Sequence, residues 1–285
     1  MVEALAQLAT RRPVATYLVT SFALAWGLLF PAAFLAPQAL QPLVIPASVV
    51  SQFGTSVVVT ALVDGRAGLT DHLRRVFLWR VGAHWYLLAV AGLPSLALLL
   101  SPALGGADLE ALVDSPGPVG GYLLGMAFLP LVNLWEESGW MAFVQSRLQD
   151  RHGPMVAAVL TAPLFALIHL PLLVRSPPGD ALLTFAFLVA MGSGFRVIVG
   201  WLYNATRSSV VIAATFHASF NGFTGTEFIG QLLPGPPPDL VVAVVLAVGT
   251  LLVIVSTRGR LGLPPREVRV PPTRPRHCDA LAERG

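Results

Sequence analysis

Five polar residues that can carry acid–base chemistry lie inside otherwise apolar stretches of this chain. Glu136 and Glu137 are adjacent in one stretch, and His169 lies in a second. A third stretch contains His217, with Asn221 four residues later. Placing one ionised carboxylate at the centre of a membrane helix costs about 2.5–3.5 kcal/mol. A chain that keeps two such groups therefore has a partner or a task for them, and catalysis is one such task.

The composition is that of a membrane protein. The chain is 55% hydrophobic and only 12% charged, with a mean hydropathy of +0.71, whereas soluble domains contain about 25% charged residues. All 18 basic residues are arginine. They lie between apolar segments rather than along one face, so they indicate membrane topology and not nucleic-acid binding.

The apolar segments predict an all-α polytopic membrane protein with about eight transmembrane helices around a polar intramembrane site. Each apolar run is long enough to cross a bilayer, which takes about 20 residues. The expected helices are residues 14–36, 43–63, 84–102, 120–146, 154–174, 181–203, 208–228 and 238–256. We expect one transmembrane domain over residues 1–256, with the site in a core of about 120–225.

The distribution of arginine predicts the orientation of these helices. All but Arg175 and Arg196 of the 18 basic residues lie on one side of this arrangement. The loops of the other side carry acidic residues instead, namely Asp108, Glu110, Asp114, Asp180, Glu227 and Asp239. By the positive-inside rule, we expect a multi-pass protein of the cell membrane with both termini in the cytoplasm.

Two segments on the arginine-rich side differ from the rest. Residues 64–82 mix arginines with large apolar side chains, which predicts a short amphipathic helix on the cytoplasmic membrane surface. Residues 257–285 are rich in proline and arginine, which predicts a disordered cytoplasmic tail.

Helix geometry indicates that the polar residues reach similar depths in the membrane. At about 1.5 Å per residue, Glu136, both histidines and Asn221 lie roughly 14–22 Å from the arginine-marked ends of their helices. A hydrocarbon core is about 30 Å thick, so all four fall in its middle band. His217 and Asn221 share one helix face. Glu136 and Glu137 point about 100° apart, so only one of them can point directly into a common site.

Each of these residues also has a purely structural interpretation. A histidine or asparagine inside a membrane often joins two helices by a hydrogen bond. One glutamate can serve as the buried ion-pair partner of Arg196, and Phe165, four residues before His169, fits simple packing. The agreement in depth of several ionisable groups favours a functional site over these separate explanations.

Three short motifs carry a resemblance to a known family. They are Glu136-Glu137-Ser-Gly-Trp140, Phe165-Ala-Leu-Ile-His169 and His217-Ala-Ser-Phe-Asn221. Together they resemble the motifs of the CPBP family of intramembrane endopeptidases, which includes the CAAX prenyl endopeptidases and their bacterial relatives, the Abi group. The similarity extends over about residues 45–225.

The resemblance implies a role for each residue. Glu136 would be the general base that polarises a water for attack on a peptide carbonyl, and His169 would help to position or activate that water. His217 and Asn221 would stabilise the oxyanion. Such a mechanism needs no cofactor. The implied substrate is a membrane-associated peptide or protein in contact with the lipid bilayer.

The chain departs from the family pattern at one position. The first motif usually runs Glu-Glu-x-x-x-Arg, and Met141 stands where that arginine would be. Arg196 or Arg147 would have to supply the cation for Glu137. If neither reaches it, Glu137 is protonated, or the protein has lost activity while keeping its fold.

A metal is the main alternative for the chemistry. Glu136, His169 and His217 resemble a zinc site with one position open for water. The chain has no His-Glu-x-x-His sequence, and the three residues come from three different helices. We therefore favour the mechanism without a divalent metal.

Two other classes of function compete with an endopeptidase. Chains of glutamate and histidine also form the relays of proton- or ion-coupled transporters. However, the chain shows no internal repeat and no pair of broken helices at matching positions in two halves. The third class is a non-catalytic membrane homologue, which only Met141 favours.

Overall fold

The computed structural model describes residues 7, 9–225 and 227–264, and every regular element in this part of the chain is a helix. The single long helices are α2 (Pro13–Leu35), α5 (Ala83–Leu100), α11 (Pro178–Ala205) and α14 (Pro238–Thr257). Two longer rods each contain a π-helical turn. One consists of α3 (Pro37–Ser48), η1 (Val49–Gly54) and the part of α4 (Thr55–Val76) before Gly65, and the other of α7 (Gly117–Gly139), η3 (Trp140–Gln145) and α8 (Ser146–His152). The shorter helices are η2 (Ser101–Ala103), α6 (Leu109–Asp114), α9 (Pro154–Ile168), α10 (Leu170–Leu173), α12 (Val210–Gly225) and α13 (Phe228–Leu232).

The prediction of an all-α, polytopic membrane protein is confirmed. All eight apolar runs are helical, and six helical segments of the described chain are long and apolar enough to cross a membrane. The difference from the expected eight arises at α9 and α12. These helices have only 15 and 16 residues, fewer than the roughly 20 needed to span the hydrocarbon. α9 ends at Ile168 because Pro171 lacks the N–H that would continue the helical hydrogen bonds.

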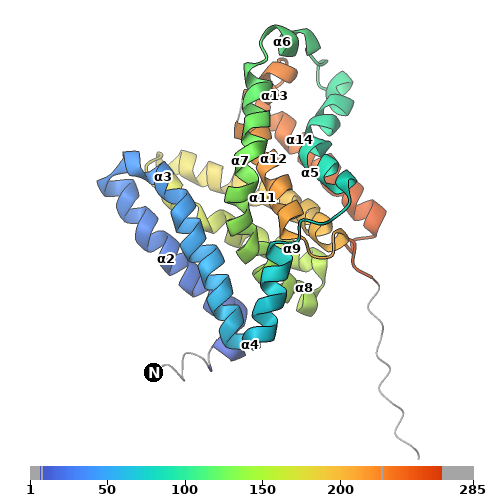
Figure 1. Ribbon diagram of the computed structural model, residues 1–285. Coiled ribbons are helices and arrows are strands. Elements are labelled where there is room, and N and C mark those ends of the chain that lie inside the picture. The colour runs from blue at the N-terminus through green and yellow to red at the C-terminus, as the bar shows by residue number, and fades with distance from the viewer. Residues whose placement is uncertain (1–6, 8, 226, 265–285) are drawn as a thin grey trace, which may run out of the picture.

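α7 lies at the centre of the molecule and positions the two glutamates. It runs between a group formed by α2, α3 and the first part of α4 and a second group formed by α5, α12 and α14 (Figure 1). Its last turn approaches α2 and η1 very closely, because a Cβ atom on Gly139 would lie 1.9 Å from the Tyr17 hydroxyl. The lack of a side chain at Gly139, two residues after Glu137, therefore permits this close approach.

α4 folds back on itself at Gly65. This residue has φ 65° and ψ −161°, a conformation that is essentially restricted to glycine. The part of α4 after the kink packs against the part before it, so that Ser56 Oγ and His72 Nε2 lie 3.0 Å apart. A helix is present in the segment 64–82, as expected, but it ends at Val76 and its His72 is buried in the bundle rather than exposed on a surface.

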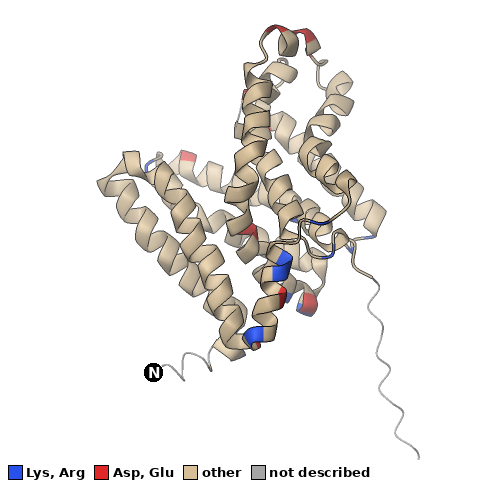
Figure 2. Ribbon diagram, in the orientation of Figure 1, with Lys and Arg blue, Asp and Glu red and all other residues tan. Residues whose placement is uncertain are grey.

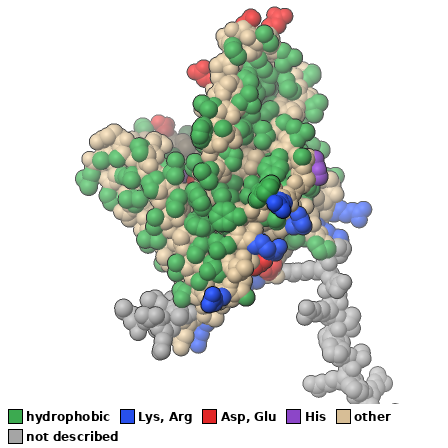
Figure 3. Space-filling view, viewed as in Figure 1, with side chains coloured by type: hydrophobic (Ala, Val, Ile, Leu, Met, Phe, Trp, Pro, Cys, Tyr) green, Lys and Arg blue, Asp and Glu red, His purple; other side chains and the backbone are tan. Residues whose placement is uncertain are grey.

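Charged residues mark the two ends of the molecule. Arginines gather at the end where α4 turns back, and the acidic residues of α6 lie at the opposite end (Figure 2). The surface between these ends is largely hydrophobic (Figure 3). Of the segment predicted as a tail, residues 257–264 are described. Thr257 is the last residue of α14, and Leu261 is buried and accepts a hydrogen bond from Asn204 through its carbonyl. Residues 265–285 lie outside the described residues.

Candidate functional site

Glu137 is held by two side chains from other helices. One carboxylate oxygen, Oε2, accepts a hydrogen bond from Arg196 Nη1 at 2.8 Å, and the other, Oε1, lies 2.8 Å from His217 Nδ1. Glu137 and Arg196 are both fully buried. α7, α11 and α12 each contribute one member, so this ion-pair cluster ties three helices together. Arg196 is therefore the cation that meets Glu137, whereas Arg147 pairs with Asp64 instead.

Aromatic rings surround the Arg196 guanidinium. Its Cζ atom lies 4.0 Å from the centroid of the Phe165 ring and 5.2 Å from that of Phe195. Trp140 lies farther away, at 5.9 Å. These ring faces favour a cation in a dry environment. The predicted packing role of Phe165 thus includes a direct contact with the buried charge.

Glu137 also fixes the orientation of His217. An ionised carboxylate only accepts hydrogen bonds, so the Nδ1 atom of His217 donates to Glu137. The ring packs edge-to-face against both Phe165 and Phe195, at centroid distances of 5.6 and 4.9 Å. Its Nε2 atom is the nitrogen left for other partners. A carboxylate that orients an imidazole in this way is a recurring arrangement in catalytic sites.

Glu136 faces a separate small cavity. Its side chain is 9% exposed and takes no part in the ion-pair cluster. The cavity has a volume of about 30 Å³. Because a water molecule needs roughly 10–15 Å³ of such space, the cavity has room for one or two waters. The polar side chains around it are Ser48, Ser51, Gln52, Glu136 and His169.

His169 shares this cavity with Glu136 and is oriented by the end of its own helix. Its Nδ1 atom lies 2.8 Å from the carbonyl oxygen of Phe165, and a carbonyl only accepts, so Nδ1 carries the proton. In the neutral ring, the other nitrogen, Nε2, is then an acceptor. A carboxylate and an imidazole acceptor beside a water-sized space form a suitable arrangement for activating a water molecule.

The predicted site residues therefore form two groups rather than one. Glu136 and His169 line the small cavity, and Glu137, Arg196 and His217 form the ion-pair cluster. Phe165 joins the groups, since its ring contacts both histidines. Asn221 lies one turn after His217 on α12 and makes no side-chain hydrogen bond within the described part of the chain.

Sequence reasoning missed the polar side chains of the neighbouring rod. Ser51 and Gln52, both on η1, line the cavity beside Glu136. The signal was available, because polar residues recur every four positions from Ser48 to Asp64 in an otherwise apolar segment. Gly139 was also missed as the residue that lets α7 approach η1.

The alternative set of metal ligands is not assembled in this structure. Among the residues described, no three His, Cys, Asp or Glu side chains are grouped so that they can hold a metal ion. His217 is directed toward Glu137, whereas Glu136 and His169 face the cavity.

Comparison with known proteins identifies a related family over part of the chain. Residues 118–223 match a family model described as type II CAAX prenyl endopeptidase Rce1-like. The match covers the three motifs and the residues of both groups, so the resemblance seen in the sequence is confirmed. A search of curated proteins gave no significant match.

Proposed function

We propose that this protein is an intramembrane endopeptidase in which Glu136 activates a water molecule to hydrolyse a peptide bond of a membrane-associated substrate. The family match over residues 118–223 supports an endopeptidase at the level of the family. The observation that carries the mechanism is the small cavity lined by both Glu136 and His169, which has the size of one or two waters.

The reaction proceeds by direct attack of water. Glu136 takes a proton from the water as its oxygen bonds to the carbonyl carbon, and the carbonyl electron pair moves to oxygen to give a tetrahedral oxyanion. When this intermediate collapses, the C–N bond breaks and Glu136 returns the proton to the leaving amine. One water is consumed for each bond cleaved, and the Glu136 carboxylate is regenerated. His169 orients the water through its acceptor nitrogen, Nε2.

The ion-pair cluster orients His217, which stabilises the oxyanion in this mechanism. Glu137 holds the His217 ring through Nδ1, so that Nε2 donates to the oxyanion when the ring carries both protons. Asn221, one turn further along α12, offers an amide N–H on the same face of the helix. Preorganised donors of this kind stabilise charge that develops in the transition state.

The charge distribution supports a placement in the cell membrane. The arginine-rich end lies in the cytoplasm under the positive-inside rule, and the acidic α6 lies on the other side. A substrate that reaches Glu136 has to enter from the bilayer or from one of these ends. A membrane-associated peptide or protein therefore fits the site better than a soluble one.

The decisive experiment replaces the carboxylate alone. Full-length protein in liposomes is given an internally quenched peptide that ends in a farnesylated cysteine motif, and the same peptide without the farnesyl group. Glu136→Gln is expected to abolish cleavage, because the amide cannot accept the proton. The matched control is Glu110→Gln on the exposed helix α6, which should cleave like the wild type. Undiminished cleavage by folded Glu136→Gln protein would refute the proposal.

Two further measurements separate this proposal from the alternatives. Cleavage that is lost on chelation and restored by zinc would support a metal mechanism. Substrate flux into sealed vesicles without any proteolysis would support a transporter. For an unknown natural substrate, membranes of cells with the wild type and with Glu136→Gln can be compared for an accumulated precursor protein.

A further inference from the structure

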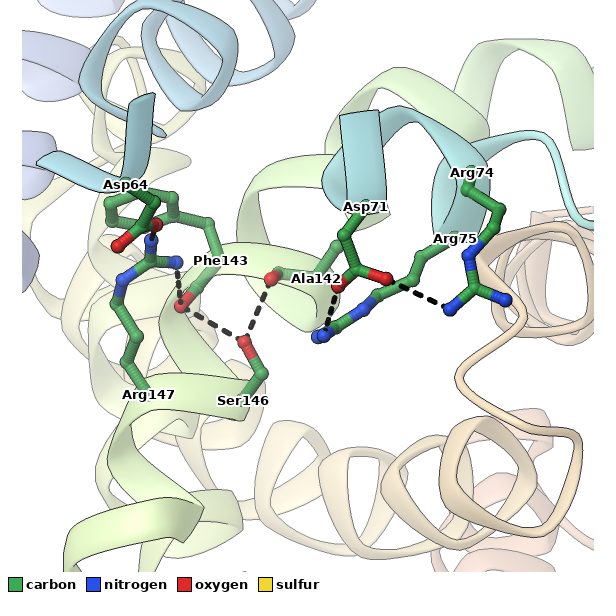
Figure 4. Close-up of polar contacts among 8 residues, drawn as sticks. All are labelled: Asp64, Asp71, Arg74, Arg75, Ala142, Phe143, Ser146 and Arg147. Carbon is green, nitrogen blue, oxygen red and sulfur yellow. Dashed lines mark hydrogen bonds and ion pairs between the residues drawn. The ribbon is translucent and has the colours of Figure 1, made fainter. Parts of the chain in front are cut away.

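A second, larger cavity lies at the arginine-rich end of the molecule. It has a volume of about 280 Å³, and we refer to it as the polar cavity. Its lining includes Thr60, Asp64, Asp71, His72, Arg75 and Ser146. Figure 4 shows the Asp64–Arg147 pair on one side and Asp71 with its two arginines on the other, with Ser146 between them. Arg74, Arg75 and Arg147 are already paired with aspartates, so the polar cavity is better suited to water than to an anionic or a cationic ligand.

A row of polar residues connects this polar cavity with the small cavity at Glu136. We call the row the polar stripe; it consists of Ser48, Gln52, Ser56, Thr60 and Asp64, at intervals of four residues. Ser48 and Gln52 line the small cavity, and Thr60 and Asp64 line the polar cavity. Residues four apart share a helix face, and the distance from Gln52 to Thr60 along the helix is about 12 Å.

The polar stripe is buried, and not all of it is satisfied by the protein. Gln52, Ser56 and Thr60 are 5%, 0% and 2% exposed. Gln52 Oε1 and Thr60 Oγ1 have no hydrogen-bond partner among the described residues. Leaving a buried polar atom without a partner costs about 1–3 kcal/mol, and apolar side chains would avoid this cost. Buried polar atoms of this kind are usually satisfied by water.

Ser56 lies in the middle of the stripe, and its hydroxyl is already bound to neighbouring groups. Its hydroxyl lies 3.0 Å from His72 Nε2 and also bonds to the Phe53 carbonyl. His72 lines the polar cavity and comes from the part of α4 that folds back after Gly65. The Ser56–His72 contact therefore stands between the two cavities.

We propose that the polar stripe is the route by which hydrolytic water passes from the polar cavity to Glu136, with the Ser56–His72 contact as its narrow point. This inference rests on the proposed function, because each hydrolysis consumes a water that the small cavity, with room for one or two, has to regain. Thr60 and Ser56 are positioning residues for this water and do not touch the substrate.

The first test removes one hydroxyl from the stripe without changing the shape of the side chain. Thr60→Val is expected to lower kcat about fivefold, equivalent to about 1 kcal/mol of barrier, with KM unchanged. Thr60→Ser keeps the hydroxyl and should restore most of the rate. The matched control is Thr250→Val on α14, whose hydroxyl is likewise buried without a partner but lies outside the stripe. Equal rates for Thr60→Val and the wild type would overturn the proposal.

The second test measures hydration directly and does not depend on activity. Cys278 is the only cysteine of the chain, so Cys278→Ser gives a background without thiols. Ser56→Cys is compared with Val59→Cys, a buried neighbour on α4 outside the stripe. A small methanethiosulfonate reagent needs a hydrated thiolate, so Ser56→Cys should react at least about tenfold faster.

The outcomes of the two tests separate the two proposals. Equal labelling of Ser56→Cys and Val59→Cys would overturn the water route even in an active protease. Fast labelling of Ser56→Cys in a protein that cleaves no peptide would support the hydrated stripe and count against the proposed function. A mixed disulfide at Ser56→Cys that slows cleavage until a reductant removes it would support both.

Discussion

Glu137 and Arg196 form an ion pair in which neither side chain is exposed, with 2.8 Å between Oε2 and Nη1. The two adjacent glutamates therefore have different surroundings, since both oxygens of Glu137 are bound and Glu136 faces a cavity. It also accounts for Met141. The cation that the related motif places there comes instead from α11, so the absence of that arginine does not leave the second glutamate unpaired.

Breaking this ion pair is expected to destabilise the protein strongly. Arg196→Met leaves a buried carboxylate uncompensated, which costs about 3–5 kcal/mol in free energy of unfolding. The double variant Glu137→Gln/Arg196→Met should lose much less than the sum of its single variants, because no buried charge remains alone. Unfolding in detergent micelles measures all three variants.

Arg74→Met is the control for these single and double variants. Arg74 pairs with Asp71 at an exposed position, so its loss should change stability by less than about 1 kcal/mol. Strictly additive losses for Glu137→Gln and Arg196→Met would show that the pair is not coupled in the folded protein.

The two nitrogens of His169 are expected to contribute unequally to activity. Nδ1 is used in the bond to the Phe165 carbonyl, and in the proposed mechanism Nε2 orients the water. The amide nitrogen of asparagine can replace Nδ1 as the donor, whereas the amide oxygen of glutamine can reach the position of Nε2 as an acceptor. We expect His169→Gln to retain about tenfold more activity than His169→Asn, which is a part of the roughly 10²–10⁴-fold that a general acid–base group contributes. Initial rates with the quenched peptide decide this, and a more active His169→Asn would contradict it.

The sequence predicted the helical membrane architecture and the residue types of the site. Long apolar runs specify helices because a bilayer allows no unpaired backbone groups, so hydropathy alone located all eight segments. The positions of Glu136 and His169 within those runs led to the proposed site, since ionisable groups there are costly. Both inferences depend on local properties of the chain.

The sequence offered candidate partners for these residues but could not choose among them. Both Arg196 and Arg147 were candidates for Glu137. Arg196 is 59 positions from Glu137 in the chain, and only the packing of α11 against its neighbours selects it. Nor does an apolar pattern reveal a π-helical turn such as η3, which begins one residue after Gly139. The return of α4 at Gly65 likewise requires a backbone conformation that the residue permits but does not specify.

Gly139 is expected to be required for the close packing of α7. A Cβ atom there would lie 1.9 Å from the Tyr17 hydroxyl and 3.3 Å from the Gln52 carbonyl oxygen. Gly139→Ala should therefore cost about 1–3 kcal/mol of stability and lower activity, because it displaces the turn that carries both glutamates. The control is Gly121→Ala on the same helix, where nothing lies within 4 Å. Equal stability of the two variants, measured by thermal unfolding, would argue against this close contact.

Gly65 is expected to maintain the fold-back of α4 and with it the Ser56–His72 contact. Its φ of 65° and ψ of −161° are unfavourable for any residue with a Cβ, so Gly65→Ala should cost about 1–3 kcal/mol although the space around it is open. Gly27→Ala on α2 is the matched control, since that glycine is helical and also has open space. It should gain up to about 1 kcal/mol from the higher helix propensity of alanine. Thermal unfolding of both variants tests this difference, and a Gly65→Ala protein as stable as Gly27→Ala would mean that α4 does not turn back at this residue.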